Sequence, residues 1–248
     1  MSEKLWYLKR CTLFEQLSEE QLHDIESTSR ARSFPRKSPI YLPVDEGNSV
    51  FLLAAGRVKI CHLTSEGKQS ILAFIDPGEL FGELALLDDG PREEYAEAVD
   101  TSTVVLISGE TMQRVMAARP DLSLGITKMI GLRRRRIEQR LKNLLFLSNR
   151  ERLTHLLLEL AEQYGQATPD GVRLGIQLSH QDLANVIGST RETVTVVLGE
   201  MQQERLLSIG RRKIVITGLD RLAASVQRSL PRLPGDPAIP RQPAARPM

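Results

Sequence analysis

The chain has 248 residues, of which 41% are hydrophobic and 26% are charged; this is ordinary for a soluble protein and allows one or two domains with cores. The sequence contains no run of 18 or more apolar residues and no apolar signal core at its N-terminus. We therefore expect no membrane partner and a cytoplasmic location. Two cysteines, Cys11 and Cys61, are too few for a disulfide framework.

Net charge is divided unevenly along the chain. Residues 1–118 carry 12 basic and 19 acidic side chains, which gives −7, whereas residues 119–248 carry 21 and 12, which gives +9. A basic half beside an acidic half is expected when one part of a protein binds nucleic acid and the other part does not. The charges therefore predict a sensor domain followed by a nucleic-acid-binding domain.

The front half has the pattern of short strands. A first helix is expected over residues 18–27, with Ser18 as its cap and Leu22 and Ile25 buried. After this helix, short apolar runs such as SVFLLAA, VKICHL and ILAFI alternate with glycines. Short strands that turn at glycine predict an antiparallel β-roll or barrel. The glycines are Gly47, Gly56, Gly67 and Gly78.

A long helix is expected over residues 119–147. Pro120 and Asp121 suit the start of a helix, because proline is pre-organised there and a carboxylate interacts well with the helix dipole. The helix is too long to be buried in one small domain, so we predict that it pairs with its own copy in a homodimer. The apolar seam consists of Ile126, Ile130, Ile137, Leu141 and Leu144.

Four successive arginines, Arg133 to Arg136, interrupt this seam. Neighbouring residues lie about 100° apart around a helix, so at least one arginine must approach the seam. Two interpretations stay open. Either the helix is solvated and one arginine extends to water, or an arginine reaches into an effector pocket or pairs across the dimer.

Residues 178–218 predict two short helices joined by a tight turn and followed by a hairpin. Ser179 can cap the first helix, and Gly188 supplies the turn. Ser189 and Glu192 have the spacing of a capping box, which places the start of the second helix there. The next segment, SIGRRKIVI, predicts two strands around a basic turn at residues 210–213. This order is that of a winged helix-turn-helix. The apolar side of the first helix consists of Leu183, Val186 and Ile187.

The second helix separates a buried side from an exposed side. Val194, Leu198 and Met201 lie at i, i+4 and i+7 and should form a buried stripe. The first turn of the opposite face is where a recognition helix touches base edges in the major groove. An arginine there offers a bidentate fork to guanine, and a glutamate can accept from the cytosine amine. The exposed face consists of Arg191, Glu192, Thr195 and Val196.

Two separate segments resemble one protein family. STRETV and the wing after it are similar to the DNA-binding domain of the Crp/Fnr family, bacterial regulators related to the cyclic-AMP receptor protein. PGELFGELALLDDGPREE, at residues 77–94, resembles the cyclic-nucleotide-binding cassette of that family, and residues 119–153 resemble its dimer helix and hinge. The resemblance spans roughly residues 9–222 in the family's order. It implies an α+β fold with a sensor β-roll (1–118), a dimerisation helix (119–147) and a winged helix-turn-helix (148–222). A mostly disordered Pro-rich tail (223–248) is expected to follow.

The resemblance implies specific roles for residues at the DNA. The family positions that read bases fall on Arg191 and Glu192, whereas a third, often arginine, falls on Val196. A valine cannot donate to guanine, but it can pack on a thymine methyl group. Residues that match family positions near phosphates would fix register rather than sequence. They are Ser179, Gln181, Thr190, Thr193 and Arg212.

The effector cassette departs further from the family pattern. The turn that presents backbone N–H groups to phosphate and a carboxylate to ribose matches Gly82, Glu83 and Leu84, although Glu83 has the alternative interpretation of only holding the turn. The Arg and Ser that clamp the cyclic phosphate fall on Glu93 and Glu94. The Thr and Ser that face adenine fall on Ile137 and Glu138.

Carboxylates at the phosphate position would repel a cyclic nucleotide, so we expect that cyclic AMP is not the effector. Arg92 lies one residue earlier, where strand alternation should turn it to the opposite face. A slip in register, or one of Arg133 to Arg136 entering the pocket, would restore the missing charge.

Together these features predict a homodimeric transcription regulator, not an enzyme, that binds a pseudo-palindromic site in double-stranded DNA. RNA polymerase is expected as a partner, and an unknown small molecule as a possible effector. The alternative is a cyclic-nucleotide-binding regulatory module of an enzyme, against which the segment at 178–218 argues. Two cysteines are too few for an iron–sulfur cluster, while haem held by a single Cys or His stays open. No cofactor is identified.

Overall fold

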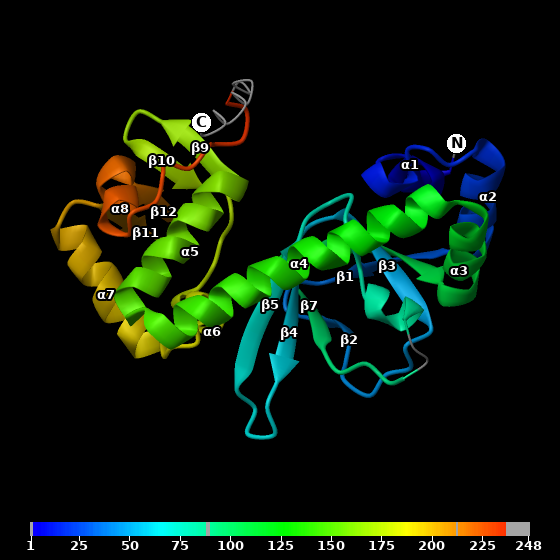
Figure 1. Ribbon diagram of the computed structural model, residues 1–248, viewed down its shortest axis with the longest axis horizontal. Coiled ribbons are helices and arrows are strands. Elements are labelled where there is room, and N and C mark those ends of the chain that lie inside the picture. The colour runs from blue at the N-terminus through cyan, green and yellow to red at the C-terminus, as the bar shows by residue number, and fades with distance from the viewer. Residues whose placement is uncertain (1, 88–89, 212, 237–248) are drawn as a thin grey trace, which may run out of the picture. The chain divides into compact units, whose positions relative to one another are not determined.

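The computed structural model describes residues 2–87, 90–211 and 213–236, and the chain divides into two compact units, Met1–Leu141 and Lys142–Met248 (Figure 1). The expected α+β architecture is confirmed, with a two-sheet roll in the first unit and a helix-turn-helix with a small sheet in the second.

The first unit begins with helices and continues as a roll of two antiparallel sheets. One sheet has the order β1-β8-β3-β6, and the other has the order β2-β7-β4-β5. The helical elements are α1 (Glu3–Lys9), η1 (Thr12–Phe14), α2 (Glu19–Thr28), η2 (Glu83–Leu86), α3 (Gly109–Ala118) and α4 (Pro120–Phe146). The strands are β1 (Arg30–Phe34), β2 (Pro39–Tyr41), β3 (Ser49–Ala55), β4 (Val58–Leu63), β5 (Gln69–Ile75), β6 (Leu80–Phe81), β7 (Tyr95–Ala98) and β8 (Ser102–Ser108).

Local signals in the sequence explain where these elements start and turn. Ser18 caps α2 in a capping box with Gln21, and Leu22 and Ile25 are buried, which confirms the predicted first helix. At Gly56 the backbone has φ of +88°, and an added Cβ would lie 2.5 Å from the Thr101 carbonyl oxygen. Only glycine fits such a turn without strain.

Two apolar clusters hold the roll together. The first lies inside the roll and contains residues from both sheets, among them Phe51, Ile60 and Phe81. The second lies under the helices and joins α1, α2 and α3 to the start of α4. Burial of this apolar surface is the main favourable term in folding of the unit. Because the start of α4 contributes to the second cluster, this part of the helix belongs to the sensor core.

Helix α4 has the predicted length and starts at Pro120 (Figure 1). Only part of its apolar seam is exposed. Ile126 is 3% exposed in the second cluster, and Ile130 packs against that cluster, so the first half of the seam faces its own domain. Ile137 and Leu141 are 40% and 53% exposed. The difference from the sequence prediction arises because periodicity shows which face of a helix is apolar but not what covers it.

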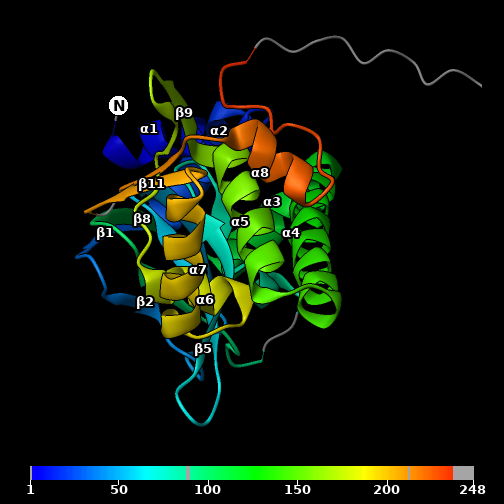
Figure 2. The ribbon, with the colours of Figure 1, turned by 90° about the vertical axis from the view of Figure 1, so that its left-hand side faces the viewer.

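The second unit is a helix-turn-helix backed by a four-stranded antiparallel sheet with the order β11-β12-β10-β9. Figure 2 shows its helices α5, α6 and α7 side by side. The hairpin of β9 and β10 was not predicted from the sequence. The elements are α5 (Asn149–Tyr164), β9 (Gly165–Thr168), β10 (Gly171–Leu174), α6 (His180–Ile187), α7 (Arg191–Gln203), β11 (Leu207–Gly210), β12 (Lys213–Ile216) and α8 (Leu219–Ser225).

Helix α6 follows the sequence prediction, whereas α7 starts one residue later than expected. Ser179 caps α6 together with Asp182, and Gly188 ends this helix with φ of +64°. The predicted cap of α7 at Ser189 is wrong. The Ser189 amide still donates to the Ala184 carbonyl and so belongs to the end of α6, while the hydroxyl of Thr190 accepts the cap bond from the Thr193 amide.

The described start of the expected tail packs on the second unit. Helix α8 includes residues 223–225, Pro231 is buried, and Arg228 forms an ion pair of 3.0 Å with Glu162 of α5. Leu233 lies close to Gly165. The remaining residues of the expected tail, 237–248, lie outside the described residues.

Candidate functional site

The exposed face of α7 contains the four residues that the sequence analysis assigned to base reading. Val194, Leu198 and Met201 are buried beneath it against the rest of the unit. The helix is therefore anchored by one side and leaves the other side to solvent. The exposed residues are Arg191, Glu192, Thr195 and Val196, of which Val196 is 60% exposed.

Most of the residues assigned to phosphates lie at the starts of α6 and α7. Ser179 and Thr190 are the N-caps of the two helices, and the Thr193 hydroxyl lies 3.0 Å from that of Thr190. Gln181 is exposed, and its amide donates to Asn185. Backbone N–H groups at helix starts favour anions, so these positions suit phosphate oxygens.

The wing of the same unit, β11 and β12, carries basic side chains. Strands β11 and β12 pair with Gly210 opposite Lys213, which confirms the predicted hairpin. Arg211 and Lys213 are exposed at its tip. Arg212, which the sequence analysis placed near a phosphate, lies outside the described residues.

Arg152 of α5 supports the turn between α6 and α7, and the sequence analysis did not identify this residue. Its Nη1 donates to the carbonyl oxygens of Ile187 at 2.8 Å and Gly188 at 3.4 Å, and its Nη2 donates to Asn149 Oδ1 at 2.6 Å. The last carbonyls of a helix have no partner within the helix, so a guanidinium there satisfies them. No local sequence pattern signals such a contact between distant residues.

A second group of polar residues gathers at the cassette turn in the first unit. Gly82 adopts φ of +68°, and Glu83 after it is 7% exposed. Glu83 Oε1 lies 2.8 Å from Arg133 Nη1 of α4, and Arg133 also donates to the Leu80 carbonyl oxygen. One arginine of the run 133–136 therefore enters the cassette, as the second interpretation of that run allowed.

The register of the cassette differs by one residue from the sequence expectation. Arg92 is 8% exposed, with its guanidinium over the ring of Tyr41 at 4.3 Å and its Nη2 2.6 Å from the Ser49 carbonyl oxygen. Glu93, which was expected to face the phosphate position, is exposed. The cause is backbone pairing ahead of β7, where the Arg92 amide donates to the Asp45 carbonyl and alternation turns 92 inward and 93 outward.

Glu94 returns to the inner face and is half-buried. It accepts a hydrogen bond of 2.7 Å from the Tyr41 hydroxyl. Burial raises the pKa of the Glu94 carboxyl, and the nearby Glu83 carboxylate adds to this, while Tyr41, Arg133 and Arg92 act in the opposite direction. Burial likewise lowers the pKa of the Arg92 guanidinium. The site thus combines two carboxylates with two guanidinium groups.

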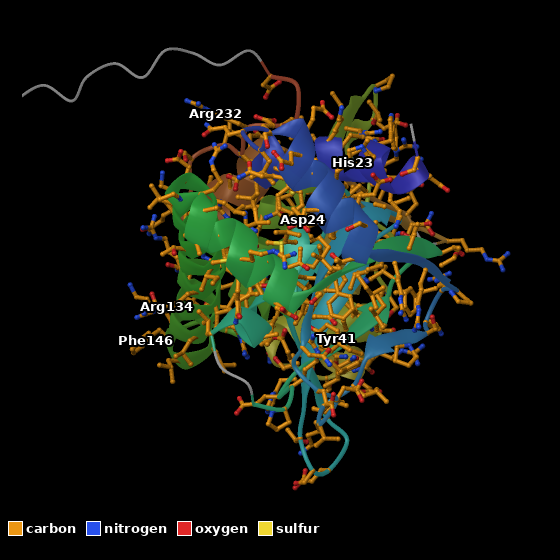
Figure 3. All side chains as sticks on the ribbon, turned by 90° about the vertical axis from the view of Figure 1, so that its right-hand side faces the viewer. His23, Asp24, Tyr41, Arg134, Phe146 and Arg232 are labelled. Carbon is orange, nitrogen blue, oxygen red and sulfur yellow. The ribbon has the colours of Figure 1, made fainter. Side chains whose placement is uncertain are left out.

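The other residues assigned to the effector lie outside this group. Leu84 is 48% exposed, Ile137 is 40% exposed, and Glu138 forms a surface ion pair of 2.7 Å with Arg134. Figure 3 shows Tyr41 among the side chains of the roll and Arg134 at the outer edge of α4. The structure therefore brings Glu83 and Glu94 together with Arg92 and Arg133.

The side-chain clusters and helix lengths of the described part of the chain bear on metal ligation and on membrane insertion. Its His, Cys, Asp and Glu side chains form no group of three or more that could hold a metal ion. Cys11 and Cys61 are buried, and burial raises the pKa of their thiols to about 11 and about 12. Among the described helices, none is long and apolar enough to cross a bilayer.

Comparison with known proteins gives matches over both units. A model of the cyclic nucleotide-binding domain matches residues 31–119, and a model of the Crp-like helix-turn-helix domain matches residues 151–225. The chain is 31% identical over 206 residues to the global nitrogen regulator of Synechocystis sp., covering 82% of this chain and 89% of the relative. It is 30% identical over 203 residues to the cyclic AMP receptor protein of Thermus thermophilus, covering 82% and 91%. The solved structure of FixK2 from Bradyrhizobium japonicum superposes with a TM-score of 0.69 at 25% identity, over 79% of this chain and 96% of that one.

The position of Glu94 leads to a prediction about stability and pH. Because its pKa is raised in the folded state, the folded protein holds this proton to higher pH than the unfolded chain. Glu94 therefore costs stability as pH rises above the ordinary glutamate range. We expect Glu94→Gln to have a larger free energy of unfolding than the wild type at pH 7, and this advantage should shrink as pH falls toward 4.

Urea unfolding at several pH values measures this difference, and Glu93→Gln is the matched control. That variant removes the same charge from an exposed position next door. It should change stability by less than about 0.5 kcal/mol. Equal effects of the two variants at pH 7 would contradict the burial of Glu94.

Proposed function

Because this chain belongs to the Crp/Fnr family of transcription regulators, we propose that α7 enters the major groove and reads the target sequence with its first two turns. The chain combines a sensor domain of the cyclic nucleotide-binding type with a helix-turn-helix DNA-binding domain. The observation that carries the proposal is the exposure of Arg191 and Glu192 at the start of a helix whose other face is buried.

Direct readout is assigned by side-chain chemistry. Arg191 pairs with O6 and N7 of a guanine, and Glu192 accepts from a cytosine amine. Val196, an exposed valine one turn further on, packs on a thymine methyl group. The residues at phosphates, Ser179, Gln181, Thr190, Thr193 and Arg212, hold the register of the helix on the duplex.

Dimerisation is assigned to the second half of α4. The first half is covered by its own domain, whereas Ile137 and Leu141 leave apolar surface exposed on the helix. Two copies of this surface paired along a twofold axis would give an isologous interface. A twofold dimer presents two recognition helices, which matches a pseudo-palindromic site.

The charges at the cassette argue against cyclic AMP as the effector. The inward position of Arg92 supplies one guanidinium, but Glu94 adds a half-buried carboxylate, and Arg133 is already paired with Glu83. The four ionic groups sum to zero, so a phosphate anion finds no surplus positive charge. The relatives do not indicate a single effector either, since one is named a nitrogen regulator and another a cyclic AMP receptor.

The remaining parts of the proposal follow from the family. As a transcription regulator, the protein acts in the cytoplasm, has RNA polymerase as a partner and catalyses no reaction. The alternative, a cyclic-nucleotide-binding regulatory module of an enzyme, does not account for the Crp-like helix-turn-helix domain at residues 151–225.

Loss of the Arg191 guanidinium should weaken specific binding. We expect Arg191→Ala to lower affinity for the cognate site by about 1–3 kcal/mol and to relax preference at one guanine of each half-site. Arg212→Ala should weaken binding to all DNA sequences to a similar extent and reduce the dependence of affinity on salt concentration. Fluorescence anisotropy at fixed salt measures both. Unchanged cognate affinity of Arg191→Ala would show that α7 is not the recognition helix.

Charge placed on the exposed half of α4 should separate the protomers. Replacing both Ile137 and Leu141 by Asp puts four like charges into the proposed interface. We expect a monomer in sedimentation velocity, with most of the DNA affinity lost, because one half-site supplies only part of the contacts. A double variant that sediments as a dimer would exclude this helix as the principal interface.

The effector proposal is tested with the full-length protein. Isothermal titration with cyclic AMP or cyclic GMP should give no affinity tighter than about millimolar, which corresponds to roughly −4 kcal/mol. DNA binding should not respond to either nucleotide. A micromolar dissociation constant for one of them would overturn the charge argument.

A further inference from the structure

A side-chain hydrogen bond joins the first residue of α6 to the second turn of α7. His180 Nδ1 lies 2.8 Å from the hydroxyl oxygen of Thr195. The Thr195 hydroxyl in turn donates to the carbonyl oxygen of Arg191, one turn earlier in α7, at 2.8 Å. The bond therefore reaches a residue on the exposed face of α7.

One arrangement of protons satisfies both contacts of the Thr195 hydroxyl. A threonine hydroxyl has one hydrogen, and here that hydrogen is given to the Arg191 carbonyl. With that hydrogen on the Arg191 carbonyl, the hydroxyl oxygen accepts from His180 in the tautomer that carries its proton on Nδ1. The χ1 angle of a threonine in a helix is divided between two rotamers, only one of which a given set of hydrogen bonds allows. Two simultaneous bonds to the same oxygen select one of them.

The selected rotamer changes what Thr195 can offer to DNA. A free hydroxyl donates and accepts, and so tolerates several bases. With its hydrogen engaged by the Arg191 carbonyl and one lone pair engaged by His180, the Thr195 hydroxyl can no longer donate to a base, which leaves the methyl group and one acceptor lone pair. A methyl group recognises the 5-methyl group of thymine in the major groove. The exposed Val196 beside it extends the apolar surface.

We propose that His180 is a positioning residue for base recognition: it holds Thr195 so that the methyl group of Thr195 reads a thymine in the target half-site. The inference rests on the proposed entry of α7 into the major groove. It adds a specificity determinant that lies on α6 rather than on α7.

The test uses the full-length protein and a cognate duplex in which each thymine of the half-site is replaced in turn by uracil. Uracil lacks only the 5-methyl group, so it removes the apolar contact and keeps every hydrogen bond. Loss of one buried methyl-sized group should weaken wild-type binding about fourfold at the thymine that Thr195 contacts, which is told from the thymine on Val196 because only the former responds to changes at position 195. His180→Ala should reduce this thymine preference to nearly onefold at that position.

Conservative variants separate positioning from other roles. In His180→Asn, the amide nitrogen can take the place of Nδ1, so the thymine preference should return. Thr195→Val presents an apolar group without needing His180, so the double variant with His180→Ala should bind like Thr195→Val alone. Thr195→Ser keeps the hydroxyl but lacks the methyl group, so it should lose the thymine preference.

The outcomes distinguish this inference from the proposed function. Circular dichroism melting confirms that each variant is folded, and Arg191→Ala on the same duplex tests the placement of α7 itself. If Arg191→Ala behaves as predicted while His180→Ala keeps the full thymine preference, the positioning role is overturned. If His180→Ala weakens binding to all duplexes equally, the positioning role is also overturned, because that result indicates a phosphate contact. Loss of preference that is restored by His180→Asn supports it.

Discussion

The ion pair between Glu83 and Arg133 ties the long helix to the sensor domain. Glu83 sits at the cassette turn and Arg133 on α4, with oxygen and nitrogen 2.8 Å apart and little of either side chain exposed. Removing one partner of a buried pair costs about 3–5 kcal/mol, since the other charge is left without compensation. The position of α4 therefore depends on the conformation of the cassette turn. An effector that alters this turn would bias the same helix that we assign to dimerisation.

The DNA-binding unit is held by different means. Helix α7, which we propose as the recognition helix, is fixed from behind by a buried apolar stripe, at its start by the Thr190 cap, and at the preceding turn by Arg152. The His180 bond adds a constraint on its exposed face. Such support matters because base reading requires side chains to be held within fractions of an ångström. These contacts hold α7 within its own unit.

Local patterns in the sequence predicted much of the fold, and long-range packing explains what they missed. The cap at Ser18, the turn at Gly188 and the start of α4 at Pro120 depend on near neighbours, so residue types reveal them. The inward turn of Arg92 depends on pairing with the segment around Asp45, far away in the chain. A slip of one residue exchanges the two faces of a strand, so this part of the site could not be assigned from spacing.

The same limit applies to α4 and to the contacts of single arginines. The apolar period identified the face of the helix, but only the structure shows that Ile126 is covered by the core of its own domain. The sequence left open which of the four successive arginines enters the cassette. Arg133 does so because the fold of the roll places Glu83 beside it, and the sequence of the helix alone does not show this. Residue types predicted which side chains are apolar or charged, whereas the residues that they contact could be identified only from the folded structure.

Selection of binding sites from random DNA by the full-length protein tests the central claim most directly. The account predicts an enriched pseudo-palindrome, with a guanine in each half-site and half-site centres about 10 base pairs apart or a multiple of this. Enrichment of a single unrepeated motif would contradict the twofold arrangement. The absence of any enriched sequence, in a protein shown to be folded, would contradict specific DNA recognition by α7.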